Sequence, residues 1–176
     1  MPRIKRLASL LSAVAALAAF AAGAHAQEQS YTSETDDYTL ELPSQVWKAL
    51  PRTDSAHQHT EYVNGERSDG YLRVRRATLS GETNLPEYAR NEADTKLRFM
   101  PGYVVGGKQT PFSGRLGGIV TTYEYTTAGK PMAGRVYYLK ADERTVFVLH
   151  FQGARDRLQR IQNQTDAIAR SFKPKQ

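Results

Sequence analysis

The segment 145–152 constrains the fold most strongly, because it has the pattern of a strand that is apolar on both faces. Successive side chains of a strand point to opposite faces. Both sets are apolar here: Val146 and Val148 on one face, and Phe147, Leu149 and Phe151 on the other. Such a strand lies in the middle of a sheet that is covered on both sides. The chain is therefore expected to place a layer of structure on each face of a sheet.

The remaining hydrophobic patterns predict more strands and two helices. Strand patterns occur at 37–43, 60–63, 71–79, 103–108, 118–126 and 134–140. Apolar residues at three- and four-residue steps predict helices at 85–100, after the capping residue Asn84, and at 155–172. One further turn of helix is expected at 45–50, around Trp47. This order of elements predicts an α+β domain in which helices flank a largely antiparallel sheet.

The first 26 residues have the pattern of a secretory signal peptide. Three bases within the first six residues precede an apolar run at 7–22, and the triplet Ala-His-Ala at 24–26 is a small-x-small cleavage site. Cleavage is expected between Ala26 and Gln27. An uncleaved membrane anchor is the alternative, but the run is rich in alanine and near the lower length limit for crossing a bilayer.

Removal of this signal leaves 150 residues, enough for one domain. We expect a flexible leader at 27–36 and a single domain at 37–174. The formal net charge falls from +6 to +3 without the three bases of the signal, so the basicity does not indicate a nucleic-acid-binding protein.

The chain contains no cysteine, which excludes disulfides, thiolate metal ligands and the lipidated cysteine of a bacterial lipoprotein. The Ala-rich signal and the cysteine-free domain indicate a bacterial envelope protein. Its expected location is the periplasm or the medium, with no stable membrane anchor after cleavage.

The layout of the mature chain carries a family resemblance. Its features are an opening strand that ends in proline near a tryptophan (Tyr38 to Trp47), a strand from Gly117-Gly118 to Tyr125, a hairpin of Arg135-Val136-Tyr137-Tyr138 with 146–151, and a last helix ending at Ser171-Phe172-Lys173. This layout resembles the PsbP-like and DcrB-like superfamily, which includes extrinsic photosystem II subunits, small bacterial envelope proteins and a fungal Ran-binding protein. The resemblance implies an α/β/α sandwich whose members bind or assist other proteins and share no common catalytic site.

The segment 57–61 is a candidate metal site. In an extended backbone, His57, His59 and Glu61 point to the same side and can bring two imidazoles and a carboxylate to one metal ion. The alternative is a solvent-facing loop or edge strand, since no second ligand cluster supports the motif.

Aromatic and basic side chains on the strands are candidates for a ligand or partner surface. Tyr123 and Tyr125 share one face of their strand, and Tyr137 lies across the expected hairpin. These rings either floor a groove or pack across strands in the core. Arg73 lies on the polar side of its strand, whereas Arg76 falls where an apolar residue is expected. We interpret Arg76 as a bulge or strand end, or else as an inward arginine that binds an anion.

His150, between Leu149 and Phe151, is either a general base or a sheet-end histidine satisfied by one hydrogen bond. The chain has no G-x-S-x-G motif to supply a serine nucleophile.

The sequence therefore predicts a non-enzymatic accessory or protein-binding domain without a cofactor. Its expected partner is an envelope protein, and its expected contact surface is the sheet rim around Arg73, Tyr123 and Tyr137. The alternative is a periplasmic small-ligand or metal-binding protein, either with or without weak enzymatic activity.

Overall fold

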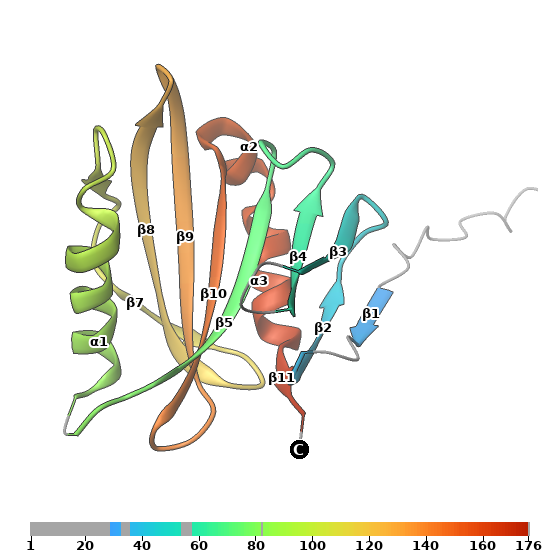
Figure 1. Cartoon of the computed structure of the whole chain (residues 1–176), viewed down its shortest axis with the longest axis vertical. Coiled ribbons are helices and arrows are strands. Elements are labelled where there is room, and N and C mark those ends of the chain that lie inside the picture. Colours follow the sequence, from blue (N-terminus) through green and yellow to red (C-terminus); the bar gives the residue numbers. More distant parts are fainter. Residues whose placement is uncertain (1–28, 33–35, 54–57, 82, 176) are drawn as a thin grey trace, which may run out of the picture.

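The computed structural model describes residues 29–32, 36–53, 58–81 and 83–175, and Figure 1 shows their arrangement. The signal peptide predicted at 1–26, with its cleavage site between Ala26 and Gln27, lies outside these residues, and so does His57. Within the described ranges, none of the helices is long and apolar enough to cross a membrane.

Eight antiparallel strands form the main sheet of the molecule (Figure 1). In spatial order they are β3 (Trp47–Thr53), β4 (Gln58–Asn64), β5 (Tyr71–Thr78), β10 (Thr145–Ala154), β9 (Lys130–Lys140), β8 (Gly117–Thr127) and β6 (Val104–Val105), with β7 (Thr110–Ser113) also paired to β8. A second sheet has the order β1 (Gln29–Thr32), β2 (Tyr38–Leu42) and β11 (Lys173–Pro174). The large antiparallel sheet with a few helices confirms the α+β fold class.

The strand with two apolar faces, β10, lies in the interior of the sheet as its sequence predicts. It pairs with β5 on one side and with β9 on the other. Phe147, Leu149 and Phe151 belong to one buried cluster, whereas Val146 and Val148 belong to a second. Because the two clusters lie on opposite faces of β10, the sheet separates two hydrophobic cores.

The first core lies between the sheet and the C-terminal helices. Helices α2 (Arg155–Arg160) and α3 (Gln162–Ser171) follow β10 directly, and Ile168 and Phe172 are fully buried in this core. The small β1–β2–β11 sheet packs beside α3. The continuous helix expected at 155–172 is interrupted at Ile161, where ψ is 12°.

The second core lies under α1 (Leu85–Glu92) and the π-helical turn η1 (Ala93–Leu97). Helix α1 begins where the sequence predicts, since the Asn84 side chain accepts a hydrogen bond of 2.9 Å from the backbone N–H of Glu87. Ala89 and Leu97 are buried against the β10 valines and against Tyr138. Helices therefore cover part of the sheet on each of its faces.

Two local expectations are corrected by the structure. Residues 45–50 do not form a turn of helix, because the chain enters strand β3 at Trp47. Pro51 is tolerated in β3 since this strand is an edge of the sheet and hydrogen-bonds to β4 alone. Part of the leader predicted at 27–36 is also a strand, because β1 pairs with β2 and places Tyr31 against the ring of Tyr62.

Candidate functional site

The candidate site lies on the α1 side of the sheet, where strands β3, β4 and β5 extend beyond the helix. Helix α1 packs over β8 and β9. Glu61 of β4 stands opposite Arg73 of β5, which in turn stands opposite His150 of β10. Directly opposite residues point to the same face, so these three side chains form one row across the sheet. In the described part of the chain, no helix covers this row at β3, β4 and β5.

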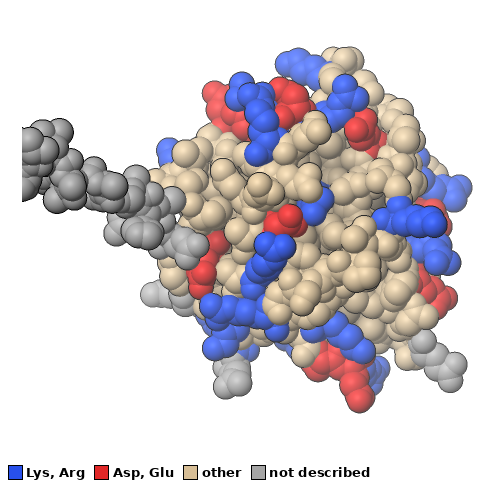
Figure 2. All heavy atoms as spheres, turned by 180° about the vertical axis from the view of Figure 1, so that it is seen from behind, with Lys and Arg blue, Asp and Glu red and all other residues tan. Residues whose placement is uncertain are grey.

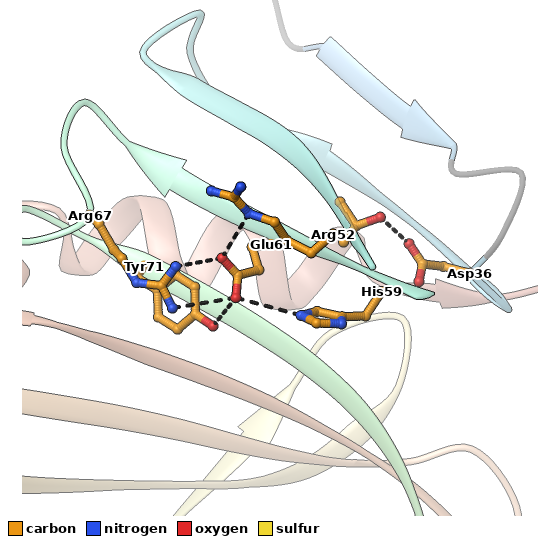
Figure 3. A network of polar contacts seen from close by, with 7 residues as sticks. Asp36, Arg52, His59, Glu61, Arg67 and Tyr71 are labelled. Carbon is orange, nitrogen blue, oxygen red and sulfur yellow. Dashed lines mark hydrogen bonds and ion pairs between the residues drawn. The ribbon is translucent and has the colours of Figure 1, made fainter. Parts of the chain in front are cut away.

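The carboxylate of Glu61 is the centre of a polar network on this face (Figure 3). Arg67 donates two hydrogen bonds to it, of 2.6 and 3.3 Å, and the hydroxyl of Tyr71 donates one of 2.8 Å. Nε of Arg52 lies 3.6 Å and Nε2 of His59 lies 3.5 Å from the two carboxylate oxygens. Both oxygens are therefore in contact with donors.

The electrostatics of the network hold Glu61 in its charged form. Burial alone would raise the pKa of this carboxyl group, but the hydrogen bonds from Arg67 and Tyr71 and the charge of Arg67 outweigh burial and lower its pKa to about 2. The side chain of Glu61 is 8 % exposed, whereas those of Arg52 and Arg67 are 53 % and 58 % exposed. The acid is thus buried beneath bases that still face the solvent.

The local sequence explains how this network assembles. Glu61 and His59 lie two residues apart in β4 and therefore share a face. The turn after β4 carries Arg67, whose guanidinium stacks 4.0 Å over the ring of Tyr71 at the start of β5. Arg52 comes from β3, where it stands opposite His59. Three consecutive antiparallel strands therefore bring all five side chains to one place.

This surface carries an excess of positive charge. We define the basic face by its five charged side chains: Lys48, Arg52, Glu61, Arg67 and Arg73. Four are bases with exposed side chains and one is the buried acid, so three positive charges remain in excess. Exposed bases grouped around one neutralised carboxylate suit the binding of an anionic group.

The opposite face of the molecule has no comparable excess. Figure 2 views the molecule from the side of α3, where acidic and basic side chains are interspersed. Several bases there pair with an acid, as in Arg135–Asp166 at 2.8 Å and Arg160–Asp156 at 2.7 Å. The basic face differs in that its four exposed bases surround a single acid, Glu61.

A second polar cluster adjoins the basic face across β10. Gln152 donates a 2.8 Å hydrogen bond to the hydroxyl of Tyr123, and this hydroxyl lies 2.6 Å from Nε2 of His150. Burial, together with the charges of Arg75 and Arg73, lowers the pKa of His150 to about 4. The neutral imidazole is hydrogen-bonded to the Tyr123 hydroxyl, and its tautomer decides which of the two groups donates. This geometry fits a structural histidine satisfied by one partner.

The structure separates the residues that the sequence proposed for one partner surface. Tyr137 is fully buried in the first core, so it cannot contribute to a contact surface. Tyr123 is also buried, on the α1 side, and Tyr125 packs against it at 5.8 Å between ring centroids. Arg76 is exposed and pairs with Asp37 at 3.3 Å, so the inward-arginine hypothesis is wrong. Arg73 alone of this group faces the solvent on the basic face.

Two of the three residues proposed as metal ligands lie within the described part of the chain. His59 and Glu61 lie side by side as predicted, but His57 lies outside the described residues. Across the described ranges, no group of three or more histidines and acids is placed to hold a metal ion. The Glu61 carboxylate is already in contact with two guanidinium groups, and these cations disfavour the approach of a metal cation.

Sequence reasoning missed Lys48, Arg52, Arg67 and Tyr71 as members of the site. Arg67 lies in a turn and Arg52 in a strand that was expected to be partly helical. One signal in the sequence could have linked Arg73 to Glu61. Glu61 is the only acid within 58–65, and a single hairpin separates Arg73 from it.

Comparison with solved structures identifies the architecture. LpqN, involved in cell envelope biogenesis of Mycobacterium tuberculosis, matches with a TM-score of 0.57 and 16% identity over 85% of this chain and 92% of its own. The cyanobacterial PsbP protein CyanoP from Synechocystis sp. PCC 6803 matches with a TM-score of 0.51 and 15% identity over 90% of this chain and 98% of its own. The fold is PsbP-like.

A third structure of this PsbP-like fold is PA94 from Pseudomonas aeruginosa, a protein of unknown function. It has a TM-score of 0.51 and 12% identity over 85% of this chain and 98% of its own. Comparison with protein-family models gives no match, and comparison with curated proteins gives none either. The shared property of these proteins is therefore the fold, which confirms the resemblance noted from the sequence.

Proposed function

We propose that this chain is an exported, non-enzymatic binding domain of the bacterial envelope, and that its basic face holds an acidic segment of another envelope protein. The single observation that carries the proposal is the charge arrangement around Glu61. Arg52, Arg67 and Arg73 expose their guanidinium groups above a carboxylate that is buried and already neutralised.

An acidic peptide segment suits this arrangement for a geometric reason. A guanidinium group binds a carboxylate through two parallel hydrogen bonds, and Arg67 uses only part of its donor set on Glu61. The exposed bases come from β3, from the turn between β4 and β5, and from β5, so they are spread along a surface and not gathered in a closed cavity. A spread row of bases fits several carboxylates along an extended partner better than one small anion.

Export is supported by the sequence pattern at 1–26 and by the kind of protein that shares the fold. LpqN is described as involved in cell envelope biogenesis, which is the setting proposed here. The non-enzymatic assignment is supported by the cluster at His150. Its imidazole is neutral, hydrogen-bonded to Tyr123, and has no serine or cysteine nucleophile paired with it among the described residues.

Charge reversal on the basic face tests this proposal. The variant Lys48→Glu/Arg73→Glu changes two exposed side chains and retains Arg52, Arg67 and Tyr71, which contact the Glu61 carboxylate. The matched control is Lys130→Glu/Lys140→Glu, which makes the same charge change at two exposed positions at the ends of β9. A photo-reactive residue replaces Leu50, which lies between Lys48 and Arg52 in β3. Cross-linked products from the native envelope are then identified by mass spectrometry.

The proposal expects a protein with an acidic segment to be cross-linked by the wild type and by the control. The Lys48→Glu/Arg73→Glu variant should lose this product. Equal cross-linking by both variants, or a product whose cross-linked segment carries no excess of acidic residues, would contradict the assignment of the face.

A further inference from the structure

The edge of the sheet at β6 presents an exposed apolar segment that the proposed function does not use. Phe99 is 73 % exposed, and Val104 and Val105 are 61 % and 60 % exposed. Single exposed hydrophobic residues are ordinary on protein surfaces, but three bulky ones within seven residues are not. In Figure 1 this segment follows α1 at the margin of the molecule, on the side away from β1.

A basic residue flanks this apolar segment at each end. From Phe99 to Gly107 the chain has no charged side chain, whereas Arg98 and Lys108 stand at its two ends. No aspartate or glutamate occurs between Phe99 and Tyr123. An apolar centre with a base at each end is the composition of segments that rest in the interface of an anionic bilayer, where bases meet the headgroups and apolar side chains enter the acyl boundary.

Acidic groups near the segment are few and in part neutralised. Glu124 stands opposite Val104, but its carboxylate pairs with Arg155 at 3.2 Å. Burial raises the pKa of the Tyr103 hydroxyl, and the negative charge of Asp94 raises it further. The balance of acidic and basic side chains around the segment therefore still favours contact with an anionic surface.

The geometry favours a bilayer over a protein partner. Val104 and Val105 are adjacent in a strand, so they point to opposite faces, and Phe99 projects from the turn before them. Apolar side chains thus lie on both faces of this edge segment, here called the tip, instead of forming one flat patch. A fluid lipid interface accommodates such a tip from all sides, whereas a protein partner needs a complementary pocket.

The backbone of the tip is compatible with shallow insertion. The N–H of Gly106 donates to the carbonyl of Thr122 at 2.8 Å, and the N–H of Tyr103 donates to the carbonyl of Met100 at 3.1 Å. The N–H of Thr126 donates to the carbonyl of Pro101 at 2.7 Å, which ties the turn to β8. These bonds hold the tip in one shape and satisfy part of its backbone without water.

We propose that the tip formed by residues 98–108 is a docking element for an anionic phospholipid surface, with Phe99, Val104 and Val105 entering the interface and Arg98 and Lys108 contacting the headgroups. The proposal goes beyond the binding of an acidic protein segment, because it uses a different edge of the molecule. The basic face lies at β3 to β5, at the other side of the sheet order from β6. The two interactions are therefore separable by mutation.

Vesicle binding by the purified protein tests this proposal. The probes are vesicles of phosphatidylglycerol and phosphatidylethanolamine, with phosphatidylcholine vesicles as the neutral reference. Phe99→Ser/Val105→Ser should lower binding to the anionic vesicles about tenfold or more, since each side chain loses its apolar burial. Arg98→Gln or Lys108→Gln should each lower it about fivefold, on anionic vesicles only. Val46→Ser is the matched control, since Val46 is 52 % exposed before β3 at the opposite edge.

Insertion depth gives a second readout that does not depend on loss of binding. A Phe99→Trp variant should be quenched by brominated phospholipid, and a Val46→Trp variant should not. The native Trp47 is 1 % exposed and contributes a constant background. The proposal is overturned if the wild type does not bind anionic vesicles, if Phe99→Ser/Val105→Ser binds as the wild type does, or if binding is lost only in Lys48→Glu/Arg73→Glu. A protein cross-linked at position 99 in the absence of vesicle binding would overturn it as well.

Discussion

Nη1 of Arg67 lies 2.6 Å from Oε2 of Glu61, so a base from the β4–β5 turn neutralises a buried acid in the strand that precedes it. This contact decides the character of the whole face. Burial raises the pKa of the carboxyl group, and among the contacts that lower it the hydrogen bond from Arg67 has the largest effect. With it, the surrounding bases are left to face the solvent with their charges unbalanced.

Replacing Glu61 by glutamine should destabilise the protein by about 1–3 kcal/mol. The change leaves the Tyr71 hydroxyl and the Arg67 guanidinium with a weaker acceptor, and the two bases then repel one another. Urea unfolding measures the difference. Glu66→Gln is the control, because Glu66 is an exposed acid in the adjacent turn, and its stability should match the wild type within about 0.5 kcal/mol. Equal stability of both variants would show that the network contributes little.

The carboxyl group of Glu61 should titrate near pH 2 in the folded protein, below its ordinary value of 4.5. A lowered folded-state pKa stabilises the fold above pH 4.5, and this stabilisation is lost as the pH falls toward 2. Replacing Arg67 by methionine should raise the pKa, since burial then outweighs the remaining donors. Carbon-detected NMR of the side-chain carboxyl group follows both titrations, and an unchanged value in the variant would refute the role of Arg67.

His150 should make the protein less stable as the pH falls from about 6.5 to about 4. Its folded-state pKa is lowered to about 4 by burial and by the charges of Arg75 and Arg73, from an ordinary value of 6.5. The unfolded chain therefore binds the proton first, and folding becomes weaker over this window. A His150→Gln variant, which keeps a polar partner for Tyr123, should flatten the dependence. If the slope of unfolding free energy against pH is the same in both proteins, His150 is not its source.

Gly134 should not tolerate alanine. A Cβ atom at this position would lie 2.1 Å from Cε1 of Tyr123, the ring that stands opposite it in β8. Gly134→Ala should cost about 1–3 kcal/mol and disturb the Tyr123–His150 hydrogen bond. Gly117→Ala is a suitable control, because a Cβ there meets no atom within 4 Å. Comparable thermal unfolding of the two variants would contradict the packing described for Tyr123.

The fold was predictable because its decisive signals are local. The two apolar faces of β10 predict its central position, and the cap at Asn84 predicts the start of α1. Tyr137 was misplaced at the rim because its face depends on the register of the β8–β9 hairpin, where it stands opposite Val120 and not opposite Tyr123. One residue of register decides between core and surface.

The candidate site was less predictable because its members meet only through strand pairing. Glu61 and His59 could be placed together from their spacing, since both lie on one strand. Arg52 and Arg67 join them only once β3 pairs with β4 and the turn folds back over Tyr71. A pattern of charges spread over 26 residues of sequence, from 48 to 73, does not by itself reveal which bases share a face.

Titration with a synthetic Asp/Glu-rich peptide, followed by backbone amide NMR, tests the central claim most directly. The shifted resonances should gather on β3, β4 and β5, with Lys48, Arg67 and Arg73 among them, and Lys48→Glu/Arg73→Glu should abolish the shifts. Shifts gathered instead around α2 and α3, or the absence of any shift at millimolar peptide, would contradict the assignment of the basic face as the binding surface.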